Sequence, residues 1–184
     1  GIGGQNCHES DSYGPFTGSV NSRMLKNIGA HFVIIGHSEN REKGEDDKLI
    51  NLKIKSAIEA KLKVIFCIGE SSSDKRNKKT KSILSEQIKV GLEGIKNKSS
   101  IFIAYEPVWA IGTGIIPTSK DLFKTIEFIK SKFKDKSPKV LYGGSVNPQN
   151  IKDLKFINNI DGFLIGGASQ NAKKFIDIVK KTYS

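Results

Sequence analysis

The stretch VIFCIGE, residues 64–70, decides the fold. Five apolar residues stand in an unbroken run, and a glycine and a carboxylate follow them. A run without polar alternation is typical of a strand that is buried on both faces, as parallel strands between layers of helices are. The chain is therefore expected to form a parallel α/β sheet, with polar residues where the strands end.

The same pattern recurs five times, and helix-period segments separate the runs. The further strands are expected at IGGQN (2–6), FVIIGHS (32–38), IFIAYEP (101–107), VLYGGS (140–145) and GFLIGG (162–167). The expected apolar helix faces are Val20/Met24/Ile28, Ile50/Ile54/Ala57/Ile58, Leu84/Ile88/Leu92/Ile95, Leu122/Ile126/Ile129/Phe133 and Phe175/Val179. Asn147 and Pro148 predict an N-cap followed by the first helical residue.

Six βα units in series fit either a doubly wound open sheet or a (β/α) barrel. The first predicted strand is not followed by the G-x-G-x-x-G pattern of dinucleotide-binding sheets. Polar residues instead follow nearly every strand, and chemistry spread over many strand ends favours the barrel. We expect one domain over residues 1–184.

Composition excludes several classes of protein. Hydrophobic residues make up 37% and charged residues 27%, which is outside the range of disordered chains. No apolar run is long enough for a membrane span, and no signal peptide is visible. The two cysteines fit no metal spacing and are expected to be buried thiols in a reducing cytoplasm. We therefore expect a cytoplasmic protein with no membrane partner and no metal.

The formal net charge of +11 allows a nucleic-acid-binding surface as one reading. Only three of the 30 basic residues are arginine, although arginine is the preferred bidentate reader of bases. The lysines lie on the polar faces of the predicted helices. We therefore favour solvated faces, with some attraction for small anionic substrates, and no nucleic-acid partner.

The stretch AYEPVWAIGTG, residues 104–114, carries the first candidate catalytic residue. Glu106 ends a predicted buried strand, where partial desolvation makes a carboxylate a stronger base. An exposed carboxylate at a strand end is the alternative for this residue taken alone. The segment behind it is too apolar to remain in water and contains glycines that can absorb backbone rotation. It is typical of a loop that closes over a ligand.

Two further features are expected at the same edge of the sheet. His37 follows the predicted strand 32–38 at the start of a helical turn, which favours a neutral ring able to donate a hydrogen bond to a carbonyl oxygen. The Gly-Gly pairs in YGGSV and IGGAS follow the last two strands, where barrels often bind phosphate. A base, an electrophile, a phosphate site and a lid together indicate proton abstraction beside a carbonyl in a small phosphorylated substrate.

GHSE, CIGE, AYEPVWAIGTG, YGGSV and GFLIGGAS occur in this order, and with them the whole chain resembles the triosephosphate isomerase family. The resemblance implies an isomerase of glycolysis and gluconeogenesis, without metal or organic cofactor, that shuttles a proton through an enediolate. In that family, a glutamate base acts beside a neutral histidine. The resemblance also implies a homodimer, through the loop GPFTGS around Thr17.

The resemblance assigns roles to individual residues. Glu106 is the implied base, His37 the electrophile, and Glu39 a carboxylate that contacts a catalytic lysine. The implied phosphate-binding residues are Gly112, Ser145, Gly166 and Gly167. Tyr142 and Ser145 are the implied latch of the lid, and the lid segment itself is Pro107, Val108, Trp109, Ala110, Ile111, Gly112 and Thr113.

The chain departs from the family in two ways. About six of the eight βα units are expected, so the barrel is incomplete, and the first two units with the Asn-x-Lys segment of the catalytic lysine are the missing part. Asn51-Leu52-Lys53 has that spacing but lies inside a helix-period run. Asn40 replaces the arginine that the family usually has after GHSE. We expect little activity from this chain and a doubtful dimer; a non-catalytic phosphate-binding remnant is the alternative.

Overall fold

The computed structural model describes residues 1–133 and 137–184. The chain forms two compact units. The first unit consists of Gly1–Ile68 and Ser85–Ile103, and the second of Gly69–Leu84 and Ala104–Ser184. The sheet has six strands in chain order, β1-β2-β3-β4-β5-β6. This order is that of successive βα units in a barrel of which six of eight units are present.

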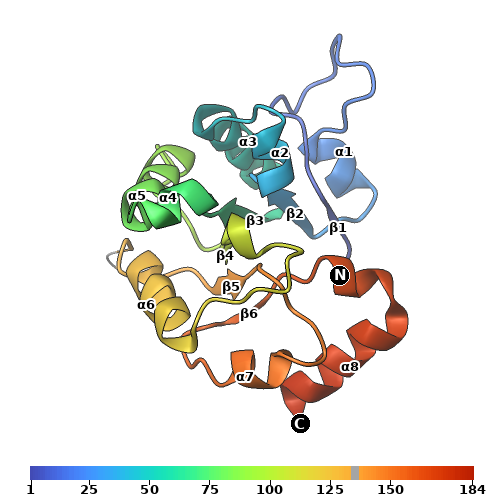
Figure 1. Cartoon of the computed structure of the whole chain (residues 1–184). Coiled ribbons are helices and arrows are strands. Elements are labelled where there is room, and N and C mark those ends of the chain that lie inside the picture. The colour runs from blue at the N-terminus through green and yellow to red at the C-terminus, as the bar shows by residue number, and fades with distance from the viewer. Residues whose placement is uncertain (134–136) are drawn as a thin grey trace. The chain divides into compact units, whose positions relative to one another are not determined.

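Strands and helices alternate along the chain as predicted (Figure 1). The strands are β1 (Gly3–Gly4), β2 (Phe32–Ile35), β3 (Lys63–Ile68), β4 (Ile101–Tyr105), β5 (Val140–Tyr142) and β6 (Gly162–Phe163). The α-helices are α1 (Ser22–Asn27), α2 (Ser38–Glu42), α3 (Asp47–Glu59), α4 (Ser72–Arg76), α5 (Thr80–Gly91), α6 (Ser119–Lys130), α7 (Ile151–Lys155) and α8 (Ala172–Tyr183). Two 3₁₀ helices, η1 (Val108–Ala110) and η2 (Gly167–Gln170), follow β4 and β6.

The first unit is built on β1, β2 and β3, which pair in parallel. Val33 and Ile35 of β2 and Val64 and Phe66 of β3 are fully buried. The other face is less covered than unbroken apolar strands predict, because Phe32, Ile34 and Ile65 are only half-buried. Helix α3 packs beside β2 and β3. The Asp46 carboxylate caps its first turn by accepting from the Leu49 N–H.

The predicted apolar faces of the three long central helices are buried. Ile50, Ile54 and Ala57 of α3 are inaccessible to solvent, and so are Leu122, Ile126 and Ile129 of α6. The four residues predicted for α5 are buried as well, although Leu92 and Ile95 lie beyond its last residue, Gly91. Two predicted residues differ: Ile58 of α3 is only half-buried, and Phe133 lies outside α6, which ends at Lys130. A sustained 3.6-residue period therefore identified the core-facing stripe.

At the other helices the predictions were wrong in detail. Helix α1 buries Ser22 and Leu25, whereas Val20, Met24 and Ile28 are exposed. Helix α8 buries Ile178, while Phe175 and Val179 are each 40% exposed. Helix α7 begins at Ile151, after a turn in which the Asn147 side chain accepts from the N–H groups of Gln149 and Asn150.

The second unit contains the parallel pair β5 and β6, with α6 beside β5 and α7 against α8. Thr118 caps α6 by accepting from the Asp121 N–H. None of the helices formed by residues 1–133 and 137–184 has the length and apolarity that crossing a bilayer requires.

Candidate active site

Glu106 lies directly after β4 and is 2% exposed. Two glycines make its position possible. A Cβ atom on Gly143 would lie 2.9 Å from the Glu106 Cγ, and one on Gly69 would lie 1.7 Å from the Glu106 carbonyl oxygen. The Gly143 N–H also donates to the Tyr105 carbonyl at 2.8 Å. The glycine turn of YGGSV is therefore packed against the candidate base, and the alternative of an exposed carboxylate at this strand end does not hold.

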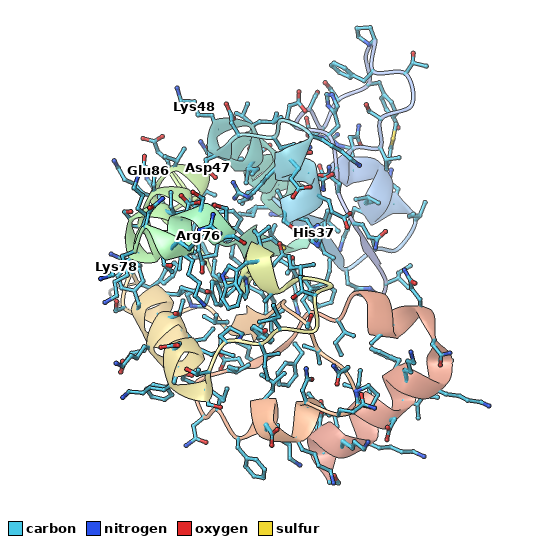
Figure 2. All side chains as sticks on the ribbon, viewed as in Figure 1. His37, Asp47, Lys48, Arg76, Lys78 and Glu86 are labelled. Atoms are coloured by element: carbon cyan, nitrogen blue, oxygen red, sulfur yellow. The ribbon has the colours of Figure 1, made fainter. Side chains whose placement is uncertain are left out.

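His37 follows β2 in the first unit and is half-buried at the start of α2 (Figure 2). Its Nδ1 atom accepts a hydrogen bond from the Glu39 N–H at 3.3 Å. A neutral imidazole that accepts at Nδ1 carries its proton on Nε2. The ring is thus arranged to donate from Nε2. Glu39 itself lies in the first turn of α2 with its side chain exposed.

The lid segment, residues 107–113, begins as a short 3₁₀ turn. The Ala110 N–H donates to the Pro107 carbonyl at 2.7 Å, and Gly112 adopts a positive φ of 68°. Ser145 contacts the segment from the YGGSV loop: its Oγ donates to the Ala110 carbonyl at 2.6 Å and accepts from the Gly114 N–H at 3.3 Å. The lid is therefore docked on the glycine-rich loop after β5.

Tyr142, the other latch residue suggested by the sequence, is fully buried. Its hydroxyl lies so close to Gly144 that a Cβ there would be 2.3 Å away. Within residues 1–133 and 137–184, that hydroxyl has no hydrogen-bond partner, and burial raises the pKa of Tyr142. The contact between lid and latch in this conformation is thus made through Ser145 rather than Tyr142.

Gly166 and Gly167 are exposed at the start of η2. A Cβ at either position would have no neighbour within 4 Å, so the space beside their backbone is open. The Ser169 N–H and hydroxyl both bond to the Gly166 carbonyl, at 2.8 and 2.7 Å. The Gly166 carbonyl is therefore hydrogen-bonded within the turn. A turn of this kind can present its neighbouring N–H groups to an anion.

Glu70 is a residue of this region to which the sequence had assigned no role. Its carboxylate is 1% exposed, accepts from the Tyr105 hydroxyl at 3.1 Å and accepts from the Trp109 indole N–H at 3.0 Å. Its carbonyl accepts from the Val108 N–H at 3.1 Å. Desolvation raises the pKa of Glu70, and the bonds from Trp109 and Tyr105 oppose that shift. The sequence contained a feature that could have revealed this residue, because Glu70 follows an apolar strand in the same way as Glu106 does.

Lys53 does not supply a lysine at a strand end. It lies inside α3, as expected, and its ammonium is paired with Glu45 and with the Asn6 side chain in a buried cluster. The residue after Asn40, Arg41, donates from its guanidinium to Asp47 at 2.6 Å and to the carbonyls of Gly36 and Cys67. The loop after β2 is therefore tied down by this arginine.

The described residues contain no group of three His, Cys, Asp or Glu side chains that could hold a metal ion. Both cysteines are buried thiols that form no disulfide among the described residues, and burial raises the pKa of the Cys7 thiol to about 11.

Comparison with known proteins gives a consistent result. The sequence pattern of the triosephosphate isomerase family matches residues 1–182. The triosephosphate isomerase of Thermodesulfovibrio yellowstonii is 46% identical over 177 residues, which cover 92% of this chain and 72% of that protein. That of Mycoplasma mobile is 42% identical over 180 residues, 97% of this chain and 74% of the relative.

The fold agrees as well. The crystal structure of triosephosphate isomerase from Bartonella henselae superimposes with a TM-score of 0.89 at 39% identity, covering 99% of this chain and 76% of that one. The chain thus spans about three quarters of the length of these relatives and reproduces their barrel over that part. On sequence and on structure alike, the chain belongs to the triosephosphate isomerase family.

Proposed function

We propose that the site interconverts glyceraldehyde 3-phosphate and dihydroxyacetone phosphate, the reaction of glycolysis and gluconeogenesis. The observation that carries the proposal is the setting of Glu106: a carboxylate 2% exposed, seated against the Gly143 turn and followed at once by the lid. A buried carboxylate beside a closing loop is suited to taking a proton from carbon, because water is kept away from the base.

Two residues share the proton chemistry in this proposal. Glu106 removes the proton from the carbon next to the substrate carbonyl and returns it to the neighbouring carbon. His37 donates its Nε2 proton in a hydrogen bond to the carbonyl oxygen, which stabilises the enediolate as charge builds there. The Nδ1 bond from the Glu39 N–H supports this assignment, since it fixes the tautomer.

Backbone N–H groups hold the substrate phosphate in the proposal. Gly166 and Gly167 have open space beside them, and Gly112 lies in a lid that Ser145 already contacts. Glycine permits the close approach that such a cradle needs. The substrate is therefore a small phosphorylated triose, and the net charge of +11 attracts it over distance.

The turnover of residues 1–184 alone is proposed to be low. The Asn-x-Lys spacing occurs at Asn51 and Lys53, and that segment lies in α3 with Lys53 paired to Glu45. Without a lysine beside the enediolate, several kcal/mol of transition-state stabilisation, roughly the effect of one or two strong donors, is lost. A phosphate-binding remnant without catalysis is the second candidate, favoured by the same observation.

A coupled assay of triose-phosphate turnover, beside calorimetry with a phosphorylated enediolate analogue, separates the two. We expect binding of the analogue and slow turnover that Glu106→Gln lowers by about 10²-fold or more, because a general base contributes that much. Glu86→Gln is the matched control, since Glu86 is an exposed carboxylate on α5 (Figure 2).

Each result has a definite meaning. Binding with no turnover above background in wild type establishes the remnant. Turnover that Glu106→Gln leaves unchanged contradicts the assignment of the base. A turnover number at the level of other family members contradicts the expectation of low activity.

The proposed partner and compartment follow the family. The loop around Thr17 is exposed in this chain and is available for a second copy, so a homodimer is the proposed assembly. The buried free thiols of Cys7 and Cys67 support a reducing cytoplasm.

A further inference from the structure

We propose that Lys75 is a positioning residue of the lid: it clamps Trp109 from the face of the indole and so stabilises the docked lid conformation. The inference concerns an interaction that the sequence did not reveal. It rests on the proposed function only in treating residues 107–113 as the lid.

The clamp has two sides. The Lys75 ammonium lies 3.2 Å from the centroid of the Trp109 ring, within the range of a cation–π interaction. The indole N–H of the same ring donates to the buried Glu70 carboxylate at 3.0 Å. One contact fixes the face of the ring and the other its edge, so the indole cannot turn without breaking one of them.

The lysine is presented by a well-fixed turn. Ser71 and Asp74 form a reciprocal capping box at the start of α4: the Ser71 Oγ accepts from the Asp74 N–H at 3.1 Å, and an Asp74 oxygen accepts from the Ser71 N–H at 3.2 Å. The Lys75 N–H donates to the Ser71 carbonyl at 3.0 Å. The backbone that carries Lys75 is therefore held before its side chain reaches the indole.

The clamp acts on the part of the lid that must move. Trp109 is central to η1, and the next residue, Ala110, accepts the Ser145 hydroxyl at 2.6 Å. Holding the indole therefore also holds the carbonyl that docks on the glycine-rich loop. Because Lys75 is exposed, we expect a moderate effect of about two- to fivefold on the docking equilibrium rather than an all-or-none switch.

The chain provides its own probe, since Trp109 is its single tryptophan. Acrylamide quenching of the fluorescence of the unliganded 184-residue protein reports how well the indole is held. We expect Lys75→Met to raise the quenching constant and Lys75→Arg to restore it, because a guanidinium also stacks on an aromatic face. Arg76→Met is the matched control: it removes one positive charge from the same helix (Figure 2).

A second measurement connects the clamp to ligand binding. Titration with inorganic phosphate and with a phosphorylated enediolate analogue should show binding about two- to fivefold weaker in Lys75→Met than in Arg76→Met. The melting temperature should be the same in both, which separates positioning from a general loss of stability. Lys75→Arg should bind as wild type does.

The outcomes are distinguishable. Equal quenching in Lys75→Met and Arg76→Met overturns the inference, and so does a Lys75→Met effect that Lys75→Arg does not reverse. A raised quenching constant in Lys75→Met, in a protein that binds neither ligand in any form, supports the clamp and counts against the proposed function instead.

Discussion

At the scale of single residues, Glu70 shows what burial does to an acid. Its carboxylate is almost inaccessible, and desolvation raises its pKa despite two hydrogen bonds that favour the ionised form. A raised pKa in the folded state means that the folded protein holds this proton more tightly than the unfolded chain does. Glu70 therefore contributes stability below its ordinary pKa, and that contribution is lost as the pH rises through the folded-state value.

This linkage predicts the pH dependence of Glu70→Gln. As the pH falls from about 7 to about 4, the free energy of unfolding of wild type should rise relative to that of the variant, because only wild type takes up the proton at this position. Urea denaturation at a series of pH values measures the difference. If the free energy of unfolding of wild type instead falls relative to that of the variant on acidification, the folded protein stabilises Glu70 as a carboxylate.

The residue scale also shows what sequence reasoning could find. Glu106 was singled out because a carboxylate after an unbroken apolar run is locally conspicuous. The structure confirms that it is buried, and its role as the base stays a prediction. The contact between Lys75 and Trp109 was not predictable, because it joins helix α4 to the 3₁₀ helix η1, 34 positions further along the chain, through side-chain rotamers. No period or spacing in the sequence carries that information.

At the scale of elements, the glycines at strand ends decide how closely loops approach the candidate base. Gly69 ends the run after β3, and its Cα faces the Glu106 backbone with no room for a methyl group. Glycine is thus required at position 69 because a side chain would not fit, and not because the backbone there needs a positive φ.

Gly69→Ala should therefore destabilise the protein by more than about 2 kcal/mol, since overpacking against backbone cannot be relieved by a rotamer change. Gly167→Ala, where a Cβ has open space, should stay within about 0.5 kcal/mol. Equilibrium urea unfolding of both variants compares them directly. Similar losses at the two sites would mean that the Gly69 loop can shift away from Glu106.

The elements also show why helix predictions succeeded in one place and failed in another. Helices α3 and α6 run for 13 and 12 residues, long enough for the apolar stripe to be defined. Helix α1 has only 6 residues, so that Val20, Met24 and Ile28 could not define a face. At α8 the period was present, but an apolar stripe alone does not show that another layer covers it.

At the scale of the whole molecule, the strand order ends at β1 and at β6. Among residues 1–133 and 137–184, each of these two strands is hydrogen-bonded to one other strand, whereas closed barrels have no edges. Helix α8 adds apolar surface, with Phe175, Ile176 and Val179 between 40% and 52% exposed. Unpaired strand edges and apolar surface both favour association.

The chain is therefore expected to self-associate as its concentration rises. Ile176→Lys should weaken that association, because it places a charge in the apolar surface of α8. Ile28→Lys, at a residue 72% exposed on another helix end, is the matched control. Size-exclusion chromatography with light scattering measures the mass, and a monomer at every concentration with strong amide protection of β1 and β6 would contradict the expectation.

The division into two units bears on how the protein can be handled. The first unit consists of two separate chain segments. Its first segment ends at Ile68, its second begins at Ser85, and the residues between them belong to the second unit. A gene shortened from its downstream end before residue 85 would encode only one of the two pieces of that unit. Dissection by simple subcloning is thus ruled out. Isolating the first unit would require rejoining the chain across residues 69–84, and isolating the second would require rejoining it across residues 85–103.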